Sequence, residues 1–223
     1  MKTLDNIIDR QRPRIRKYIL NPLLSRLRRK KIRNKRFTII SNNCWGGLVY
    51  QFFKYTYDSP TVGLYFFSEE YIRFIANLHH YMSCDLVIIP TQESRYIDLL
   101  KQKHEENKII GRIDDVEIVF LHYKTAEEAI NKWNRRKTRI HWDNLIVKFS
   151  EQNYCSPEHL AKFDAMPFDN KLVFTHKDYG LKSQIIFSEF QTLNEVPDDA
   201  THFNRYVDLI NLINGTKYQK RQP

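Results

Sequence analysis

The sequence predicts an α/β fold: a three-layer, Rossmann-like domain with a mixed, mostly parallel sheet, preceded by a basic amphipathic helical arm. Two observations lead to this prediction. Short apolar runs alternate with helix-like segments from residue 37 onward, and the charge changes at the same point. Residues 1–36 carry 14 basic and two acidic side chains, whereas the rest of the chain is close to neutral. We therefore expect an arm over 1–36, one domain over 37–215 and a disordered tail over 216–223.

The arm combines an apolar stripe with many basic residues. The stripe has one aliphatic residue in every four: Ile15, Ile19, Leu23 and Leu27. A helix of this kind in residues 10–36 can lie on an anionic membrane, where each nearby Lys or Arg contributes about 1 kcal/mol of attraction. The same stripe can instead pack on the protein's own body. Tyr18 is the arm's one aromatic residue, so the stacking platform of a single-strand nucleic-acid protein is missing and no nucleic-acid partner is expected.

Strands and helices alternate through the first half of the domain. Apolar runs predict strands over 37–40, 61–67 and 85–90. Segments 68–82, with Ser68 as N-cap, and 96–107 have the spacing of helices.

The second half begins with a hairpin signal. Two apolar runs, 108–113 and 116–123, are separated by Asp114 and Asp115, which predicts an antiparallel turn. The remaining expected elements are a helix capped by Thr125 and Glu128, a strand over 144–150, a helix with Ser156 as cap and Pro157 at its first position, strands over 171–176 and 184–190, and a last amphipathic segment ending at Gly215.

Polar residues follow five of these strands. Ligands of open α/β sheets bind beyond the carboxyl ends of the strands, so these residues are candidates for a binding site. The five groups are 41–47, 68–70, 122–123, 150–153 and 176–178. Polar residues also end strands for purely structural reasons, as turn and cap formers.

The segment SNNCWGG is the strongest candidate among them. Asn42 and Asn43 can recognise sugar hydroxyls, and Trp45 can stack on a pyranose ring. Gly46 and Gly47 allow close backbone approach, and their N–H groups at a helix start can hold a phosphate. The structural alternative is an N-cap, a tight turn and a small buried cysteine.

Several side chains could act in catalysis or binding. The candidate bases are Glu69, Glu70, His122 and Asp178. Cys44 at a helix start would have its thiolate favoured and could act as a nucleophile with His122 or His176. Asn153 and His176 are further substrate-binding candidates, and Arg135 and Arg136 could neutralise a donor phosphate, although solvated helix surface is the commoner role of such arginines.

The sequence also excludes several classes of protein. It has no apolar stretch long enough to span a membrane and no secretory signal, so we expect a cytoplasmic protein, peripheral at the inner membrane face if the arm binds there. The cysteines Cys44, Cys84 and Cys155 fit neither a disulfide framework nor a paired zinc pattern, so free thiols are expected. No bound cofactor and no metal ligand set is predicted, and metal dependence stays open.

Four segments resemble one bacterial family, usually labelled exopolysaccharide biosynthesis proteins of unknown molecular function. They are FTIISNNCWGGLVYQ, YDSPTVGLYFFSEEYIRF, IGRIDDVEIVFLHYKTAEEAINKWNRRKTRIHWDN and VKFSEQNYC. The resemblance covers about residues 35–190 and leaves the arm outside. It implies a role in building or decorating a surface polysaccharide and supplies no catalytic residues.

Three functions remain open from the sequence. The first is glycosyl transfer from an activated sugar donor to a lipid-linked saccharide at the inner membrane face. The second is a Cys44-dependent acyltransferase or hydrolase that modifies the same polymer. The third is a non-catalytic saccharide-binding assembly factor.

Overall fold

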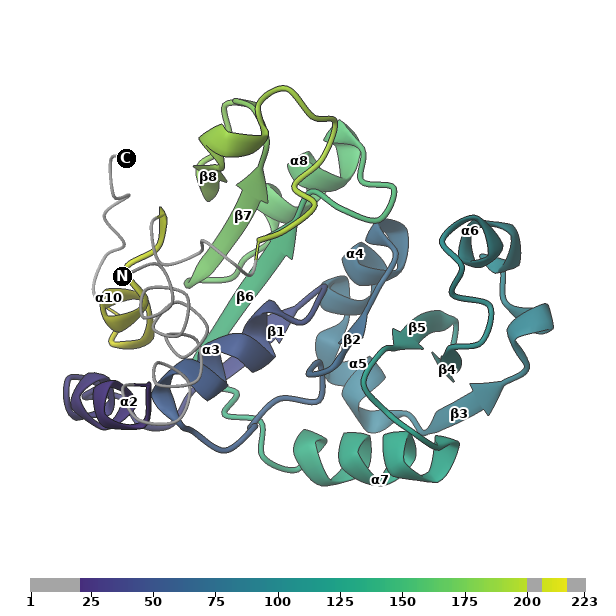
Figure 1. Cartoon of the computed structure of the whole chain (residues 1–223), viewed down its shortest axis with the longest axis horizontal. Helices are drawn as coiled ribbons and strands as arrows, with labels where there is room; N and C mark the ends of the chain where they lie inside the picture. Colours follow the sequence, from purple (N-terminus) through teal and green to yellow (C-terminus); the bar gives the residue numbers. More distant parts are fainter. Residues whose placement is uncertain (1–20, 200–205, 216–223) are drawn as a thin grey trace, which may run out of the picture.

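The structure is a computed structural model that describes residues 21–199 and 206–215 (Figure 1). Four parallel strands form sheet A, in the order β1-β6-β7-β8. They are β1 (Thr38–Ser41), β6 (Leu145–Ser150), β7 (Lys171–Thr175) and β8 (Gln184–Ile186). Adjacent apolar residues such as Ile39 and Ile40 are both buried because helices cover both faces of this parallel sheet.

Different helices cover the two faces of sheet A. Helices α3 (Trp45–Phe53) and α10 (Leu209–Ile213) pack on the face that contains Ile39 and Ile146. Helices α4 (Ser68–Ala76) and α8 (Pro157–Ala165) pack on the face that contains Ile40 and Val147. The sheet therefore lies between two helical layers, as a three-layer α/β domain requires.

Four antiparallel strands form a separate sheet B, in the order β2-β5-β4-β3. They are β2 (Leu64–Tyr65), β5 (Val116–Phe120), β4 (Ile109–Ile113) and β3 (Leu86–Ile89). One face of sheet B joins the hydrophobic core of α4 and α8, and the other packs on α6 (Ile97–Gln102). The remaining elements are α5 (Leu78–Ser83), α7 (Ala126–Lys137) and the 3₁₀ turns Thr91–Glu93 and Ser188–Phe190.

The predicted α/β class is confirmed, and all the parallel pairing lies in sheet A. The antiparallel part is larger than one hairpin, because β2 and β3 also pair antiparallel on either side of β5 and β4. The Asp114–Asp115 turn joins β4 to β5 as expected. The two sheets meet at the carboxyl end of β1, where the Phe66 N–H donates to the Asn42 carbonyl at 3.0 Å.

Helix starts agree with the sequence at two of three positions. Thr125 caps α7 by accepting a bond from the Glu128 N–H, and Ser156 caps α8 with Pro157 at the first position. Ser68 is not a cap, because α4 begins at Ser68 itself and its hydroxyl donates to the Gln152 carbonyl at 2.7 Å.

The described part of the arm is attached to the body. Helix α2 (Asn21–Lys30) lies beside α3, and the Arg28 guanidinium sits 3.9 Å from the centre of the Phe52 ring. Ile32 is buried in the core cluster of α3 and α10. Two predicted segments lie outside the described residues. They are residues 1–20, which include Ile15, Tyr18 and Ile19, and the tail over 216–223. Within the described residues, no helix combines the length and apolar character needed to cross a bilayer.

Candidate functional site

The carboxyl edge of sheet A gathers the polar residues that follow β1, β6 and β7. Parallel pairing places Ser41 beside Lys148 and Ser150 beside Phe174, so Asn42, Glu151 and His176 leave the sheet at the same edge. Three of the five polar groups, 41–47, 150–153 and 176–178, therefore meet at this edge. The other two, 68–70 and 122–123, follow β2 and β5 of sheet B, so the five strand ends do not share one sheet edge. Which of these side chains face solvent decides what the edge can bind.

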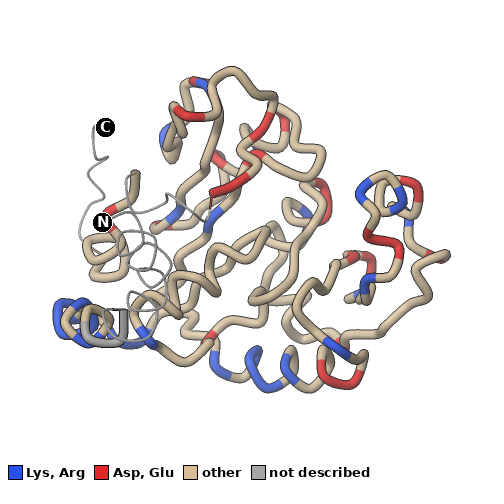
Figure 2. Tube along the Cα trace, viewed as in Figure 1, with Lys and Arg blue, Asp and Glu red and all other residues tan. Residues whose placement is uncertain are grey.

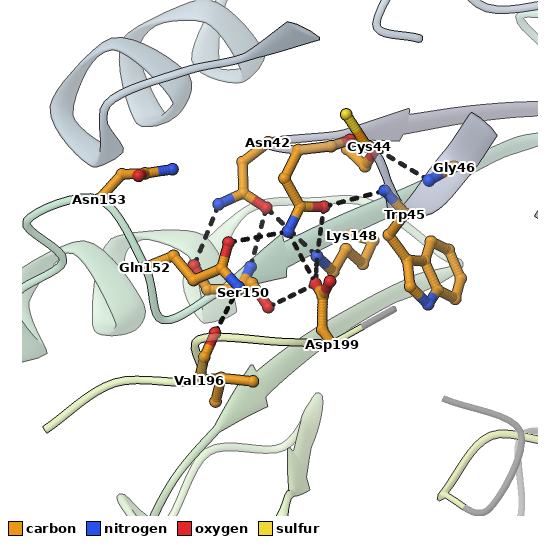
Figure 3. A network of polar contacts seen from close by, with 12 residues as sticks. Asn42, Cys44, Trp45, Gly46, Lys148, Ser150, Gln152, Asn153, Val196 and Asp199 are labelled. Carbon is orange, nitrogen blue, oxygen red and sulfur yellow. Dashed lines mark hydrogen bonds and ion pairs between the residues drawn. The ribbon is translucent and has the colours of Figure 1, made fainter. Parts of the chain in front are cut away.

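A buried ion pair lies at the centre of this edge (Figure 3). Lys148, on β6, is fully buried, and its ammonium pairs with the carboxylate of Asp199. The ammonium also donates to Asn43 Oδ1 at 2.9 Å. Asp199 Oδ2 accepts further bonds from Ser150 Oγ and Asn43 Nδ2, both at 2.8 Å. Burial lowers the pKa of Lys148, and the carboxylate of Asp199 opposes that effect.

The two asparagines belong to this network. Asn42 is fully buried and exchanges two 3.0 Å hydrogen bonds with the backbone of Ser150. Asn43 Oδ1 accepts from the Trp45 N–H at 3.1 Å, and its Nδ2 also donates to Gln152 Oε1 at 2.9 Å. Both amides are thus bonded to residues of this edge, Asn42 to the end of β6 and Asn43 to the residues around the ion pair, and they stabilise its structure.

The other residues of SNNCWGG pack α3 tightly on β1. Trp45 has no exposed ring face for a sugar, because its ring is fully buried edge-on against Phe174. The Gly46 N–H donates to Ser41 Oγ at 3.3 Å and is not directed at a ligand. A Cβ at Gly47 would lie 2.9 Å from Val62 Cγ1, so glycine is required there by close packing.

Beside this network lies an open cavity of about 260 Å³. Four sequence candidates line it: Cys44, Gly47, His122 and Arg136. The other lining residues are Leu48, Gln51, Tyr57, Val62, Gly63, Tyr123 and Lys132. Among the described residues, the lining contains two basic side chains, Lys132 and Arg136, and no carboxylate, and the carboxylate of Glu128 pairs with Lys132 from outside the lining. The cavity wall therefore carries net positive charge, which suits an anion.

The cations of the cavity are held in place. Arg136 is nearly buried, and its Nη1 donates to the Val62 carbonyl at 3.1 Å and to the Tyr123 hydroxyl at 2.7 Å. Lys132 pairs with Glu128 one helical turn earlier and lies 5.4 Å from the centre of the Tyr123 ring. Both project from α7, which carries a run of basic residues (Figure 2).

Cys44 does not have the predicted thiolate character. Its Sγ donates to the Leu64 carbonyl at 3.8 Å, and burial, aided by the nearby Asp199 carboxylate, raises its pKa to about 11. The thiol is therefore protonated near neutral pH. Burial outweighs the helix-start effect on which the sequence prediction relied.

A family model for a domain of unknown function, DUF1919, matches residues 15–218. The chain belongs to the DUF1919 family. It is also similar to an uncharacterized protein of Haemophilus influenzae, with 30% identity over 176 residues that span 78% of this chain and 79% of that protein. The family match begins at residue 15, so residues 15–36 of the arm lie within the matched region.

Two predicted bases of this DUF1919 protein are engaged in contacts between elements. Glu69 pairs with His159 on α8 at 2.9 Å, and this bond lowers the pKa of Glu69. Glu70 is buried, and its carboxylate accepts bonds from Arg95, Tyr96 and the Glu117 N–H. Burial raises the pKa of Glu70 despite these partners.

The remaining candidates also lie off the cavity. Asp178 is exposed and accepts from the Gly180 N–H in a turn. Asn153 Oδ1 accepts from Lys103 Nζ at 2.7 Å, and Arg135 is exposed on α7. His176 is 6% exposed, and its Nδ1 lies 2.7 Å from Glu151 Oε2.

The sequence reasoning missed several residues of this DUF1919 edge: Lys148, Glu151, Asp199, Tyr123 and Lys132. One signal was readable, because Lys148 is a lone charge within the apolar run LIVKF of a strand expected to be buried. A lysine in that setting requires a buried partner. Asp199 gives no such signal, since it lies in an irregular segment with no periodic pattern.

Proposed function

We propose that this DUF1919 protein is a transferase of bacterial surface-polysaccharide synthesis, which moves a sugar from a phosphate-activated donor to a lipid-linked saccharide. The observation that carries the proposal is the cavity at the start of α3, with Lys132 and Arg136 in its wall and no lining carboxylate among the described residues. A diphosphate is the leaving group of nucleotide sugars, and fixed cations stabilise the charge that develops on it. The resemblance to exopolysaccharide biosynthesis proteins supports the pathway.

The size of the cavity supports a specific mode of binding. Its volume of about 260 Å³ is smaller than typical sites for complete drug-sized ligands. The diphosphate end of a donor would occupy it, and the acceptor would approach from the open side. His122, which is exposed and lines the same cavity, is the candidate base for the acceptor hydroxyl.

A Cys44-dependent acyl transfer is the second candidate, because Cys44 and His122 line one cavity. The raised pKa of Cys44 counts against it, since only the thiolate is nucleophilic. Glycosyl transfer requires no thiolate, so it fits the cavity better.

The binding step can be tested by thermal stabilisation. Uridine or guanosine diphosphate should raise the melting temperature, because any ligand that binds only the folded state stabilises it. Lys132→Ala should weaken the apparent affinity by roughly 10–150-fold, since a charged hydrogen bond is worth roughly 1.5–3 kcal/mol. Arg135→Ala is the matched control on the same helix and should keep the wild-type response. Stabilisation by coenzyme A alone would reject glycosyl transfer, and binding of saccharide alone would favour an assembly factor.

Helix α2 supports a membrane-facing orientation of this transferase. Leu24 and Leu27 are exposed by 40% and 57%, whereas Ser25 faces the body. They lie among exposed basic residues, here Arg26, Arg29 and Lys30, a combination suited to the interface of an anionic bilayer. This combination supports the proposal that the transfer takes place at the inner membrane face, beside a lipid-linked acceptor.

A further inference from the structure

We infer that the protein binds a zinc ion between the end of α5 and the β4–β5 turn, through His80, Cys84 and Asp114. His80 Nε2 lies 2.8 Å from Asp114 Oδ2, and Cys84 Sγ lies 3.7 Å from His80 Nε2. All three donor atoms are within 4.8 Å of one another. This site is separate from the cavity and does not depend on the proposed transfer reaction.

The spacing of the three donor atoms is close to that of a tetrahedral zinc site, and His80 and Asp114 lie at ion-pair distance without the metal. Zinc bonds of about 2.0–2.3 Å in tetrahedral geometry separate the ligand atoms by roughly 3.3–3.7 Å. The distance from Cys84 Sγ to His80 Nε2 is already within this range. Asp114 Oδ2 would have to move about half an ångström away from His80 Nε2 to reach it. A nitrogen, a thiolate and a carboxylate together favour zinc over the hard cations magnesium and calcium, which prefer oxygen ligands.

Local structure holds the ligands on one side of α5. Cys84 is the C-cap of α5, four residues after His80, and the cap brings its Sγ to 3.7 Å from His80 Nε2. The Cys84 N–H and the Ser83 hydroxyl both donate to the His80 carbonyl, which fixes the last turn. Lys137 Nζ donates to the Cys84 carbonyl at 2.9 Å, which ties this turn to α7.

The site is open enough to exchange its ion. The His80 and Asp114 side chains are 44% and 54% exposed. Three protein ligands leave the fourth tetrahedral position for water, the arrangement found in catalytic zinc sites, whereas structural sites have four protein ligands. We therefore assign an accessible, water-coordinated zinc to this position. Binding would displace the thiol proton of Cys84 to solvent, because the thiolate is the ligand form.

Cobalt provides a spectroscopic test on the full-length protein. Stoichiometric Co²⁺ should give a thiolate-to-metal charge-transfer band that Zn²⁺ removes by competition. Cys84→Ser should abolish the band, whereas the matched controls Cys44→Ser and Cys155→Ser should keep it. A missing wild-type band, or a band that persists in Cys84→Ser, would overturn the inference.

The other two ligands have their own controls. His80→Gln and Asp114→Asn should each weaken zinc binding strongly, because each removes a direct ligand. The expected loss exceeds the roughly 10–100-fold that is typical when a residue that only hydrogen-bonds a ligand is changed. His79→Gln changes the neighbouring exposed histidine, which stacks on Trp142, and should leave zinc affinity unchanged. Equal affinities in His80→Gln, Asp114→Asn and wild type would show that zinc binds elsewhere.

Discussion

The Lys148 ammonium and the Asp199 carboxylate form a buried ion pair that joins the middle of sheet A to a segment more than 50 residues later in the chain. Lys148 is fully buried and Asp199 is 4% exposed by side chain. Asn43 and Ser150 also donate hydrogen bonds to the Asp199 carboxylate. These bonds replace the water that the buried carboxylate has lost. This contact holds residues 196–199 across the carboxyl edge of the sheet.

Removing one member of this pair should destabilise the protein strongly. Lys148→Met leaves the Asp199 carboxylate without its cation, and breaking a buried pair typically costs about 3–5 kcal/mol. Urea unfolding followed by circular dichroism would measure the free energy of unfolding. Lys162→Met, which removes an exposed cation paired with Glu158, is the control and should leave stability unchanged within error. Equal stability of the two variants would mean that the ion pair does not hold the edge.

The sequence predicts the local elements well because their signals are local. The capped starts of α7 and α8, the β4–β5 hairpin and the parallel strands of sheet A all follow from short-range periodicity and turn chemistry. The division into two sheets does not, because which strands become neighbours depends on contacts distant in sequence. The two-residue strand β2 shows this, since its partner β5 lies more than 50 residues away.

The candidate site is predictable only in part for the same reason. Cys44 and His122, both predicted at strand ends, line one cavity with Arg136, which was predicted separately as a ligand of the donor phosphate. The direction of a side chain is not encoded in residue type. Asn42 and Asn43 therefore turn inward to Ser150 and Asp199, although their amides would suit a sugar equally well.

The thiol of Cys44 should be unreactive at neutral pH. Its pKa of about 11 lies above that of an ordinary thiol, so the thiolate fraction stays small until the pH approaches that value. Alkylation by iodoacetamide, followed by peptide mass spectrometry, should accelerate about tenfold per pH unit between pH 8 and 10. Cys44→Ser should retain near-normal transfer activity. A loss on the order of a thousandfold would instead support covalent catalysis by Cys44.

Exposed leucines on α2 should contribute to membrane binding. The double variant Leu24→Ser and Leu27→Ser removes apolar surface that is already exposed, so the fold should tolerate it. Co-sedimentation with vesicles containing phosphatidylserine should fall several-fold, because burial of apolar side chains in the interface is lost. Val87→Ser, which changes a residue of similar exposure on β3, should bind vesicles like wild type. Unchanged sedimentation of the double variant would exclude α2 as the membrane contact.

His122 and His176 should differ in their effects on turnover. His122 is exposed in the cavity wall, so His122→Ala should lower kcat by about 10²–10⁴-fold and leave KM for the donor nearly constant, as loss of a general base does. His176 does not line the cavity, and its ring Nδ1 is hydrogen-bonded to Glu151 Oε2. His176→Ala should therefore reduce stability by about 1–3 kcal/mol, because the buried Glu151 carboxylate loses a hydrogen bond.

Steady-state transfer kinetics and urea unfolding on the same two variants would separate these roles. Thermal stabilisation by the nucleoside diphosphate should persist in His122→Ala, since the base does not hold the leaving group. The opposite pattern, with a stable but inactive His176→Ala and a fully active His122→Ala, would move the reacting centre from the cavity to the end of β7. In that case Glu151, which accepts bonds from His176 Nδ1 and the Tyr179 hydroxyl, would orient the base.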